Sequence, residues 1–128
     1  IDIQCEISPL PFKDLSKAEQ GESSANIRER VLKSRSIQTE RFKNYPNIHC
    51  NAQMSERMIH EFAEPDEQSL EILRKAMESL KLSARAYNRI LKVARTIADL
   101  EASPKVQVHH IAEAIGYRSL DRGDWGER

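Results

Sequence analysis

The stretch from Ser83 to Glu101 constrains the fold more than any other part of the chain, because it places apolar and basic residues on two sides of one helix. The broad apolar face carries Ala84, Tyr87, Ile90, Leu91, Ala94, Ile97 and Ala98. The opposite stripe carries Arg85, Arg89, Lys92 and Thr96, at offsets of 0, 4, 7 and 11. Ser83 is a good N-cap, so Arg85 falls in the first turn, where the helix dipole favours anions. A basic stripe that begins at a helix N-terminus suits a phosphate.

Other segments also have the apolar spacing of helices. We expect helices over about 24–43, from Ser55 to about Phe62, from Asp66 or Ser69 to Leu80, and over about 108–116. The 66–80 helix should turn one stripe inward, made of Leu70, Leu73, Met77 and Leu80. The last helix should turn inward Val108, Ile111, Ala112 and Ile115. The sequence therefore predicts a mainly α fold of about five helices.

The N-terminal residues have a different period. Ile1, Ile3, Cys5 and Ile7 alternate with polar residues, which is typical of a half-buried strand. No later segment offers this strand a partner, so we interpret residues 1–8 as the last strand of a sheet whose remainder is missing. Residues 9–22 contain two prolines and a polar run, which predicts a linker, and residues 23–128 then form a helical domain with a polar tail.

Charge is balanced overall but uneven along the chain. The 128 residues contain 20 Lys and Arg and 20 Asp and Glu, so no whole-molecule field attracts nucleic acid or membrane. Residues 23–45 and 81–105 each contain six basic and two acidic residues, whereas 46–80 contain three and seven. Either the helices complement one another within one domain, or the basic helices face an anionic ligand. We found no spanning apolar run and no signal peptide, so we expect a cytoplasmic protein without a membrane partner.

A resemblance narrows the function. The Ser-x-Arg-Ala opening at Ser83 resembles the sensor-2 element in the lid of AAA+ ATPases of the magnesium-chelatase branch. A longer resemblance covers the sequence from Leu82 to Leu100, together with His110-Ile-Ala-Glu-Ala-Ile and Tyr117-Arg-Ser-Leu-Asp. These segments resemble the C-terminal part of magnesium-chelatase-like proteins of the ComM/YifB type. The resemblance implies a helical AAA+ lid-type bundle, preceded by a strand of the ATPase core.

The resemblance also implies a role for particular residues. Arg85 corresponds to the sensor-2 arginine, which reaches from the lid to the γ-phosphate of ATP, and Arg89 is a second candidate for the same cleft. ATP and Mg²⁺ would be bound by the full-length parent, with none bound tightly by this fragment. The partners implied are the protein's own AAA+ core, neighbouring subunits of a ring that is expected to be a hexamer, and branched DNA during recombination.

The sequence lacks the parts of a complete ATPase. It has no Gly-x-x-x-x-Gly-Lys-Ser/Thr loop for phosphates and no apolar run ending in paired acids for Mg²⁺. No Ser-His-Asp or Cys-His arrangement is suggested by spacing. We therefore expect no catalytic residue in the isolated fragment and no ATP hydrolysis by it, although its parent should be an ATPase.

One alternative function remains open. The chain could be a free-standing helical module that binds protein or DNA, with Arg28, Arg30 and Arg35 as candidate phosphate contacts on the 24–43 helix. The adjacent His109 and His110 are candidate metal ligands by residue type, but neighbouring helical residues point about 100° apart. No suitable ligand recurs three or four residues away, and Glu113 lies four residues from His109 as a helix-stabilising pair would. We expect no metal site.

Overall fold

A computed structural model of the protein describes Ile3 and residues 23–118, which form helices and connecting loops. The elements are α2 (Ser24–Arg41), the 3-10 helix η1 (Asn51–Gln53), α3 (Glu56–Phe62), α4 (Glu67–Leu80), α5 (Ala84–Leu100) and α6 (Val108–Gly116). The expected mainly α, lid-like architecture is confirmed, and no strand occurs within these residues. The strand predicted over 1–8 lies outside the described residues except for Ile3. The linker predicted over 9–22 also lies outside the described residues, as does the tail at 119–128.

Four of the helices begin with a capping side chain, which explains where the chain turns into helix. The oxygens of Ser23, Ser55, Asp66 and Ser83 each accept a hydrogen bond from the backbone N–H three residues later. In the Asp66 cap, this bond from Ser69 lowers the pKa of the carboxyl group. Each of these helix starts is therefore specified locally, by one residue.

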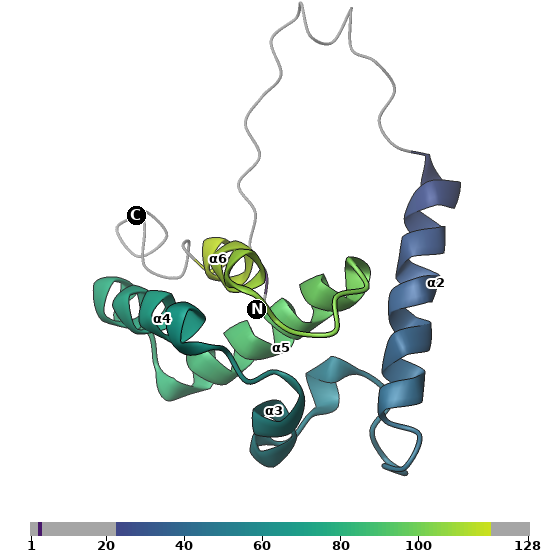
Figure 1. Cartoon of the computed structure of the whole chain (residues 1–128), viewed down its shortest axis with the longest axis horizontal. Coiled ribbons are helices and arrows are strands. Elements are labelled where there is room, and N and C mark those ends of the chain that lie inside the picture. Colours follow the sequence, from purple (N-terminus) through teal and green to yellow (C-terminus); the bar gives the residue numbers. More distant parts are fainter. Residues whose placement is uncertain (1–2, 4–22, 119–128) are drawn as a thin grey trace, which may run out of the picture.

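Helix α5 is the centre of the domain (Figure 1), and it packs against α2, η1, α3 and α6. Helix α4 packs against α6 on the far side from α2. The core is built around side chains that are almost fully buried, including Leu73, Ile90, Leu91, Ala94, Ala98 and Ile111. An edge-to-face group of Phe42, Tyr45 and Phe62 closes it near the end of α2.

Among the described residues, helix α2 meets the other helices near its C-terminal end, and its first half stands away from them (Figure 1). Ile27, Val31 and Leu32 in that half are 43%, 42% and 58% exposed. The buried residues of the helix itself are polar, Ser34 and Gln38. An apolar stripe therefore does not hold α2 against the domain.

Two inward faces differ from the sequence prediction. Leu70 is 46% exposed, whereas Ser69 beside it is fully buried. In α6, Ala112 is exposed, while His110, Ile111 and Ala114 are buried. Leu73 and Ile111 do lie in the common core as predicted, so each face differs at single positions, where α4 and α6 also pack on each other. None of the helices in the described part of the chain is long and apolar enough to cross a membrane.

Candidate functional site

The N-terminus of α5 carries the arginine that the sequence selects. The Ser83 hydroxyl accepts from the Ala86 N–H at 3.2 Å, which confirms Ser83 as the N-cap. The first turn contains no acidic residue, and the Arg85 side chain is exposed. Within the described residues Arg85 has no hydrogen-bond or ion-pair partner. A helix N-terminus and an uncommitted guanidinium at the same point can bind an anion presented from outside the domain.

The remainder of the predicted basic stripe does not form one continuous surface with Arg85. Arg89 is half-buried and has an interaction of its own. Lys92 donates to the backbone carbonyl of Ala52 at 3.0 Å. Thr96 accepts from Asn51 Nδ2 at 3.1 Å. The C-terminal half of the stripe thus holds η1 against α5, and only its N-terminal end is open to a ligand.

At the other end of α5 lies a buried polar cluster that the sequence analysis did not identify. Arg41 Nη1 donates to Asp99 Oδ2 at 2.8 Å, and Arg41 Nη2 donates to Asp99 Oδ1 at 2.6 Å. Arg95 Nε donates to Asp99 Oδ1 at 3.2 Å. The Asp99 side chain is completely buried, so two guanidinium groups share one carboxylate that has no contact with water.

Neutral side chains complete the cluster. Asn51 Nδ2 donates to Asp99 Oδ2 at 2.8 Å, and Asn51 Oδ1 accepts from Arg41 at 3.0 Å. The Asn51 backbone N–H donates to Gln38 Oε1 at 2.9 Å, and Gln38 Nε2 donates to Ser34. The buried residues of α2 are therefore satisfied by hydrogen bonds, as polar groups in an interior must be. These bonds anchor α2 to α5.

Arg95 links the same cluster to the loop before α6. Its guanidinium donates to the carbonyls of Ser103 at 2.7 Å, Pro104 at 3.2 Å and Phe62 at 3.3 Å. Burial lowers the pKa of Arg95, and the nearby Asp99 carboxylate opposes that change. The i,i+4 spacing of Arg95 and Asp99 was visible in the sequence, but their burial was not.

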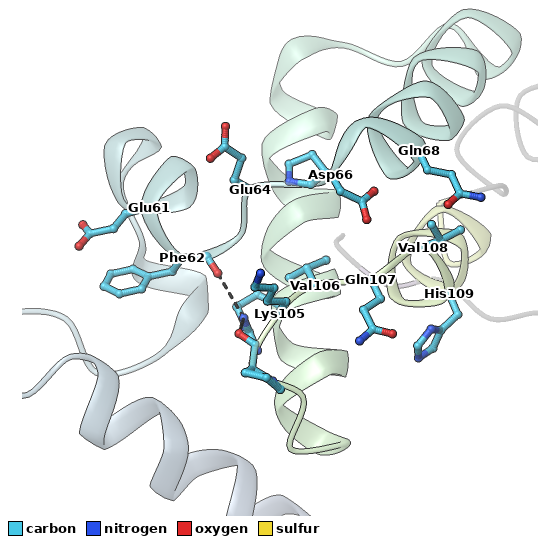
Figure 2. Close-up of a pocket in the computed structure, with 13 residues that line it drawn as sticks. Glu61, Phe62, Glu64, Asp66, Gln68, Lys105, Val106, Gln107, Val108 and His109 are labelled. Atoms are coloured by element: carbon cyan, nitrogen blue, oxygen red, sulfur yellow. Dashed lines mark hydrogen bonds between the residues drawn. The ribbon is translucent and has the colours of Figure 1, made fainter.

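A pocket of about 720 Å³ opens between the α3–α4 connection and the loop that leads into α6 (Figure 2). Its rim combines acidic Glu61, Glu64 and Asp66 with Lys105 and His109. Carboxylates on this rim disfavour a phosphate. Neither candidate arginine of α5 lines this pocket, so it does not form part of the predicted nucleotide site.

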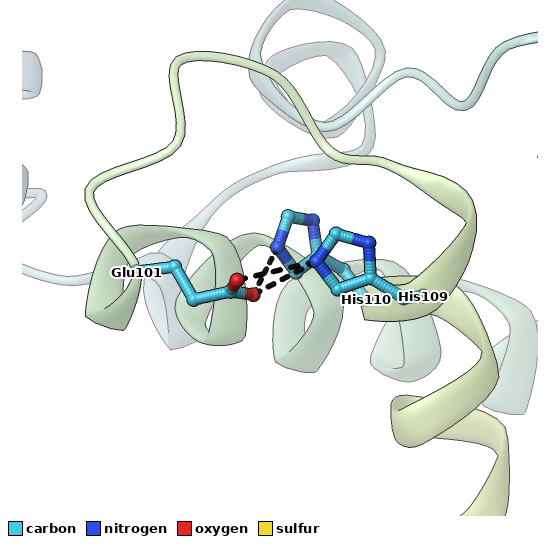
Figure 3. A group of neighbouring side chains, drawn as sticks. All are labelled: Glu101, His109 and His110. Atoms are coloured by element: carbon cyan, nitrogen blue, oxygen red, sulfur yellow. Dashed lines mark hydrogen bonds and ion pairs between the residues drawn. The ribbon is translucent and has the colours of Figure 1, made fainter.

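The two adjacent histidines converge on one carboxylate (Figure 3), which corrects the expected 100° separation. Nε2 of both His109 and His110 contacts Glu101, and the ring centroids are 4.0 Å apart. His109 pairs with Glu101 rather than with Glu113, which accepts from the Tyr117 hydroxyl. The convergence arises because the ring of His110 folds back over the start of α6.

The hydrogen bonds of His110 indicate a structural role for this group. Its Nδ1 accepts from the Gln107 backbone N–H at 2.9 Å, so the ring proton lies on Nε2 and is donated to Glu101. For neutral His110 to bind a metal through Nε2, its ring proton would have to move to Nδ1. Nδ1 could then no longer accept the hydrogen bond from Gln107. The three side chains could approach one ion, but the tautomer favours their use as a cap for α6 and a tie to α5.

Taken together, the helical architecture and the open start of α5 define a lid-like all-α domain. A family model described as magnesium chelatase, subunit ChlI C-terminal, matches residues 21–118. The chain belongs to this family, and the resemblance to chelatase-like AAA+ proteins is confirmed.

The curated relatives of the chain include proteins named ComM and YifB. The chain is 41% identical over 122 residues to the competence protein ComM of Haemophilus influenzae. It is 38% and 37% identical over 122 residues to the uncharacterized YifB proteins of Escherichia coli and Salmonella typhimurium. Each alignment covers 94% of this chain but 23% of the relative. The chain therefore spans about a quarter of the length of these relatives.

Proposed function

We propose that this chain is the lid of an ATPase and that Arg85 contacts the terminal phosphate of ATP held by a core domain. The observation that carries the proposal is the exposed Arg85 at the N-terminus of α5, in a first turn without acidic residues. The family membership supports it, because the matched family is named for a chelatase subunit. Arg89 is a less favoured second contact, because it is already half-buried and engaged.

The chain's own contribution would be to sense the nucleotide. A guanidinium suits a phosphate oxygen because its fixed donors form charge-assisted hydrogen bonds. Loss of the terminal phosphate would remove those bonds and release Arg85. Since Arg85 stands on α5, the helix that packs against α2, η1, α3 and α6, release at this point would move the lid as one body.

The wider role of the protein is proposed by analogy. ATP and Mg²⁺ would bind mainly to the core, and neighbouring subunits would complete a ring, which we take to be a hexamer. DNA recombination is the favoured task, because the chain aligns over 94% of its length with a protein named for competence. The same reasoning favours a cytoplasmic location.

The test replaces Arg85 in the full-length protein and compares it with a matched arginine. Arg57 is the control, because Ser55-Glu56-Arg57 repeats the capped position of Ser83-Ala84-Arg85 in another helix, and Arg57 is also exposed. We expect Arg85→Ala to lower ATP turnover or ATP affinity about 10- to 100-fold, the worth of a charge-assisted hydrogen bond of about 1.5–3 kcal/mol. Arg57→Ala should leave both unchanged.

Two experiments decide the outcome. In the first, the steady-state kcat and KM for ATP separate an effect on turnover from an effect on binding. Circular dichroism of the 128-residue chain should show that Arg85→Ala leaves the fold intact. Equal ATP kinetics in the Arg85→Ala and wild-type proteins would reject the proposal.

Direct DNA binding by α2 is the second candidate. Arg28, Arg30 and Arg35 are exposed, and α2 stands away from the domain. This candidate predicts that the isolated chain binds duplex DNA, with an affinity that falls steeply as salt rises. Replacing the three arginines by alanine should weaken binding, and an absence of binding at low salt would eliminate it.

A further inference from the structure

A groove of about 330 Å³ lies along the C-terminal half of α5, between α6 and η1. Its floor is a stripe of Val93, Ile97 and Leu100, at offsets of 0, 4 and 7, which covers about 10 Å of one helix face. Exposure rises along this stripe, from 9% at Val93 to 43% at Leu100. The described part of the chain therefore leaves apolar surface of α5 uncovered at this end.

The polar groups on the rim of the groove are bonded to one another. On one side, Lys92 Nζ donates to the carbonyl of Ala52 at 3.0 Å. On the other side, the Tyr117 hydroxyl donates to Glu113 Oε2 at 3.1 Å. An apolar occupant could cover the floor without breaking either bond, so it would leave no polar group unsatisfied. The groove therefore suits apolar side chains better than an ion or a polar ligand.

Ile3 lines the same groove, although it lies far from α5 in the sequence. Its side chain is 49% exposed, and the cavity remains open beside it. The sequence around it alternates apolar and polar residues, with Ile1, Ile3, Cys5 and Ile7 at the odd positions. In an extended chain these odd side chains share one face and lie about 6.6 Å apart. Three of them span about 13 Å, which is close to the length of the stripe on α5.

We propose that the groove is the docking site of residues 1–8 of this chain, with the odd-numbered side chains packed on the stripe of Val93, Ile97 and Leu100. A strand can pack one face while its two edges pair with other strands, so this contact is compatible with a place for residues 1–8 in a sheet. The segment that precedes the domain is then held by the helix that carries Arg85 at its other end. The proposal goes beyond nucleotide sensing and does not depend on it.

The two faces of the segment provide a matched pair of variants. Ile3→Asp places a charge on the docked face, whereas Gln4→Asp places the same group one residue away, on the opposite face. In the 128-residue chain we expect Ile3→Asp to lower the Tm by roughly 2–8 °C, because it removes a partly buried apolar side chain. Gln4→Asp should change the Tm much less. Equal Tm values for the two variants would overturn the proposal.

Disulfide trapping gives an independent readout of the contact. In a background of Cys5→Ala and Cys50→Ala, the pair Ile3→Cys and Leu100→Cys should close under mild oxidation of a dilute sample. Leu70, which is 46% exposed on α4 and outside the groove, provides the control pair of Ile3→Cys and Leu70→Cys. We expect the Leu100 pair to close at least about tenfold faster, because docking raises the effective concentration of the two thiols. Mass spectrometry of proteolytic fragments identifies the bond.

Each result of the trapping experiment has one meaning. Faster closure of the Leu100 pair within single chains would support the assigned contact. Equal rates for the two pairs would overturn it. Covalent dimers through Leu100→Cys, in place of the intramolecular bond, would assign the groove to a second copy and would also overturn it. Neither experiment contains ATP, so a failure here is distinct from a failure of the role proposed for Arg85.

Discussion

Arg41 in the last turn of α2 and Asp99 near the end of α5 face each other through two parallel hydrogen bonds, although 58 residues separate them in the sequence. The carboxylate is fully buried and the guanidinium is 11% exposed. Their fork-to-fork geometry fixes both the position and the rotation of α2 relative to α5. The pair is thus the main tie between the outlying helix and the centre of the domain.

Removing the shared carboxylate should be costly. Asp99→Asn leaves Arg41 and Arg95 buried without their counter-charge, so we expect the free energy of unfolding to fall by about 3–5 kcal/mol. Urea unfolding followed by far-ultraviolet circular dichroism measures the loss. Glu71→Gln, which breaks an exposed pair on α4, is the control and should change stability by less than about 1 kcal/mol. Similar losses in the two variants would contradict this account of the cluster.

Asn51 should matter for a different reason, because it carries no charge. Its side chain donates to Asp99 and Thr96 and accepts from Arg41, all in the interior. Asn51→Ala leaves those groups partly unsatisfied, and we expect a loss of about 1–3 kcal/mol. Gln53→Ala in the same 3-10 helix is exposed and should cost less. Equal unfolding midpoints for the two variants would argue against the network.

The cap of α5 can be tested separately from Arg85. Ser83→Ala removes the acceptor for the Ala86 N–H and should lower stability by about 1 kcal/mol. Ser79→Ala is the matched control, because Ser79 is an exposed serine within α4 and alanine favours helix there. Thermal unfolding of both variants gives the comparison. A Ser83→Ala variant as stable as the wild type would show that the cap is dispensable.

Stability should depend on the ionisation of Glu101. Burial raises the pKa of its carboxyl group, but hydrogen bonds from His110 and His109 outweigh this, and the net pKa lies below the ordinary 4.5. Because the folded-state pKa is lower than the unfolded-state pKa, ionised Glu101 stabilises the fold above about pH 4.5. That contribution is lost as pH falls through the folded-state pKa.

The matching experiment follows unfolding of Glu101→Gln against pH. This variant should be less stable than the wild type at neutral pH, and the difference should shrink as the pH falls below about 4.5. Glu64→Gln, which also removes one exposed carboxyl group, is the control for the change in net charge. A gap between Glu101→Gln and wild type that widens in acid would have the wrong sign.

Zinc provides a test of the role of His110. Since Nδ1 of His110 accepts from Gln107, we expect an excess of Zn²⁺ to leave the Tm of the chain unchanged, as in the His109→Ala variant. A zinc-dependent rise in Tm that disappears in His109→Ala would show that the three side chains do bind a metal.

Local signals in the sequence predicted the helices well. Ser83 as a cap and the stop near Gly116 are confirmed, because each depends on neighbouring residues alone. The 24–43 helix was also expected, but its few apolar residues do not show how the helix is held, because Ile27 and Val31 are exposed while Phe42, at 3% exposure, reaches the core.

The polar cluster could not be predicted by the same means. An analysis of apolar periodicity assigns polar residues to the surface, so it predicts that Arg41, Asn51 and Asp99 are exposed. Their burial depends on pairing across the fold, which leaves no repeating pattern in the sequence. The convergence of His109 and His110 was missed for a related reason. A helical wheel assumes that side chains project radially from the helix axis, whereas the ring of His110 bends back toward Gln107.

The polar attachment of α2 also bears on how the helix presents its exposed half. Two apolar helices can slide or roll over each other with little change in contact area, but a forked pair such as Arg41 and Asp99 has one good alignment. A roll of a few tens of degrees at the base would break it. Arg28 and Leu32 are therefore aimed in a fixed direction from a support several turns away, and a partner would meet a pre-oriented surface rather than one it must first order.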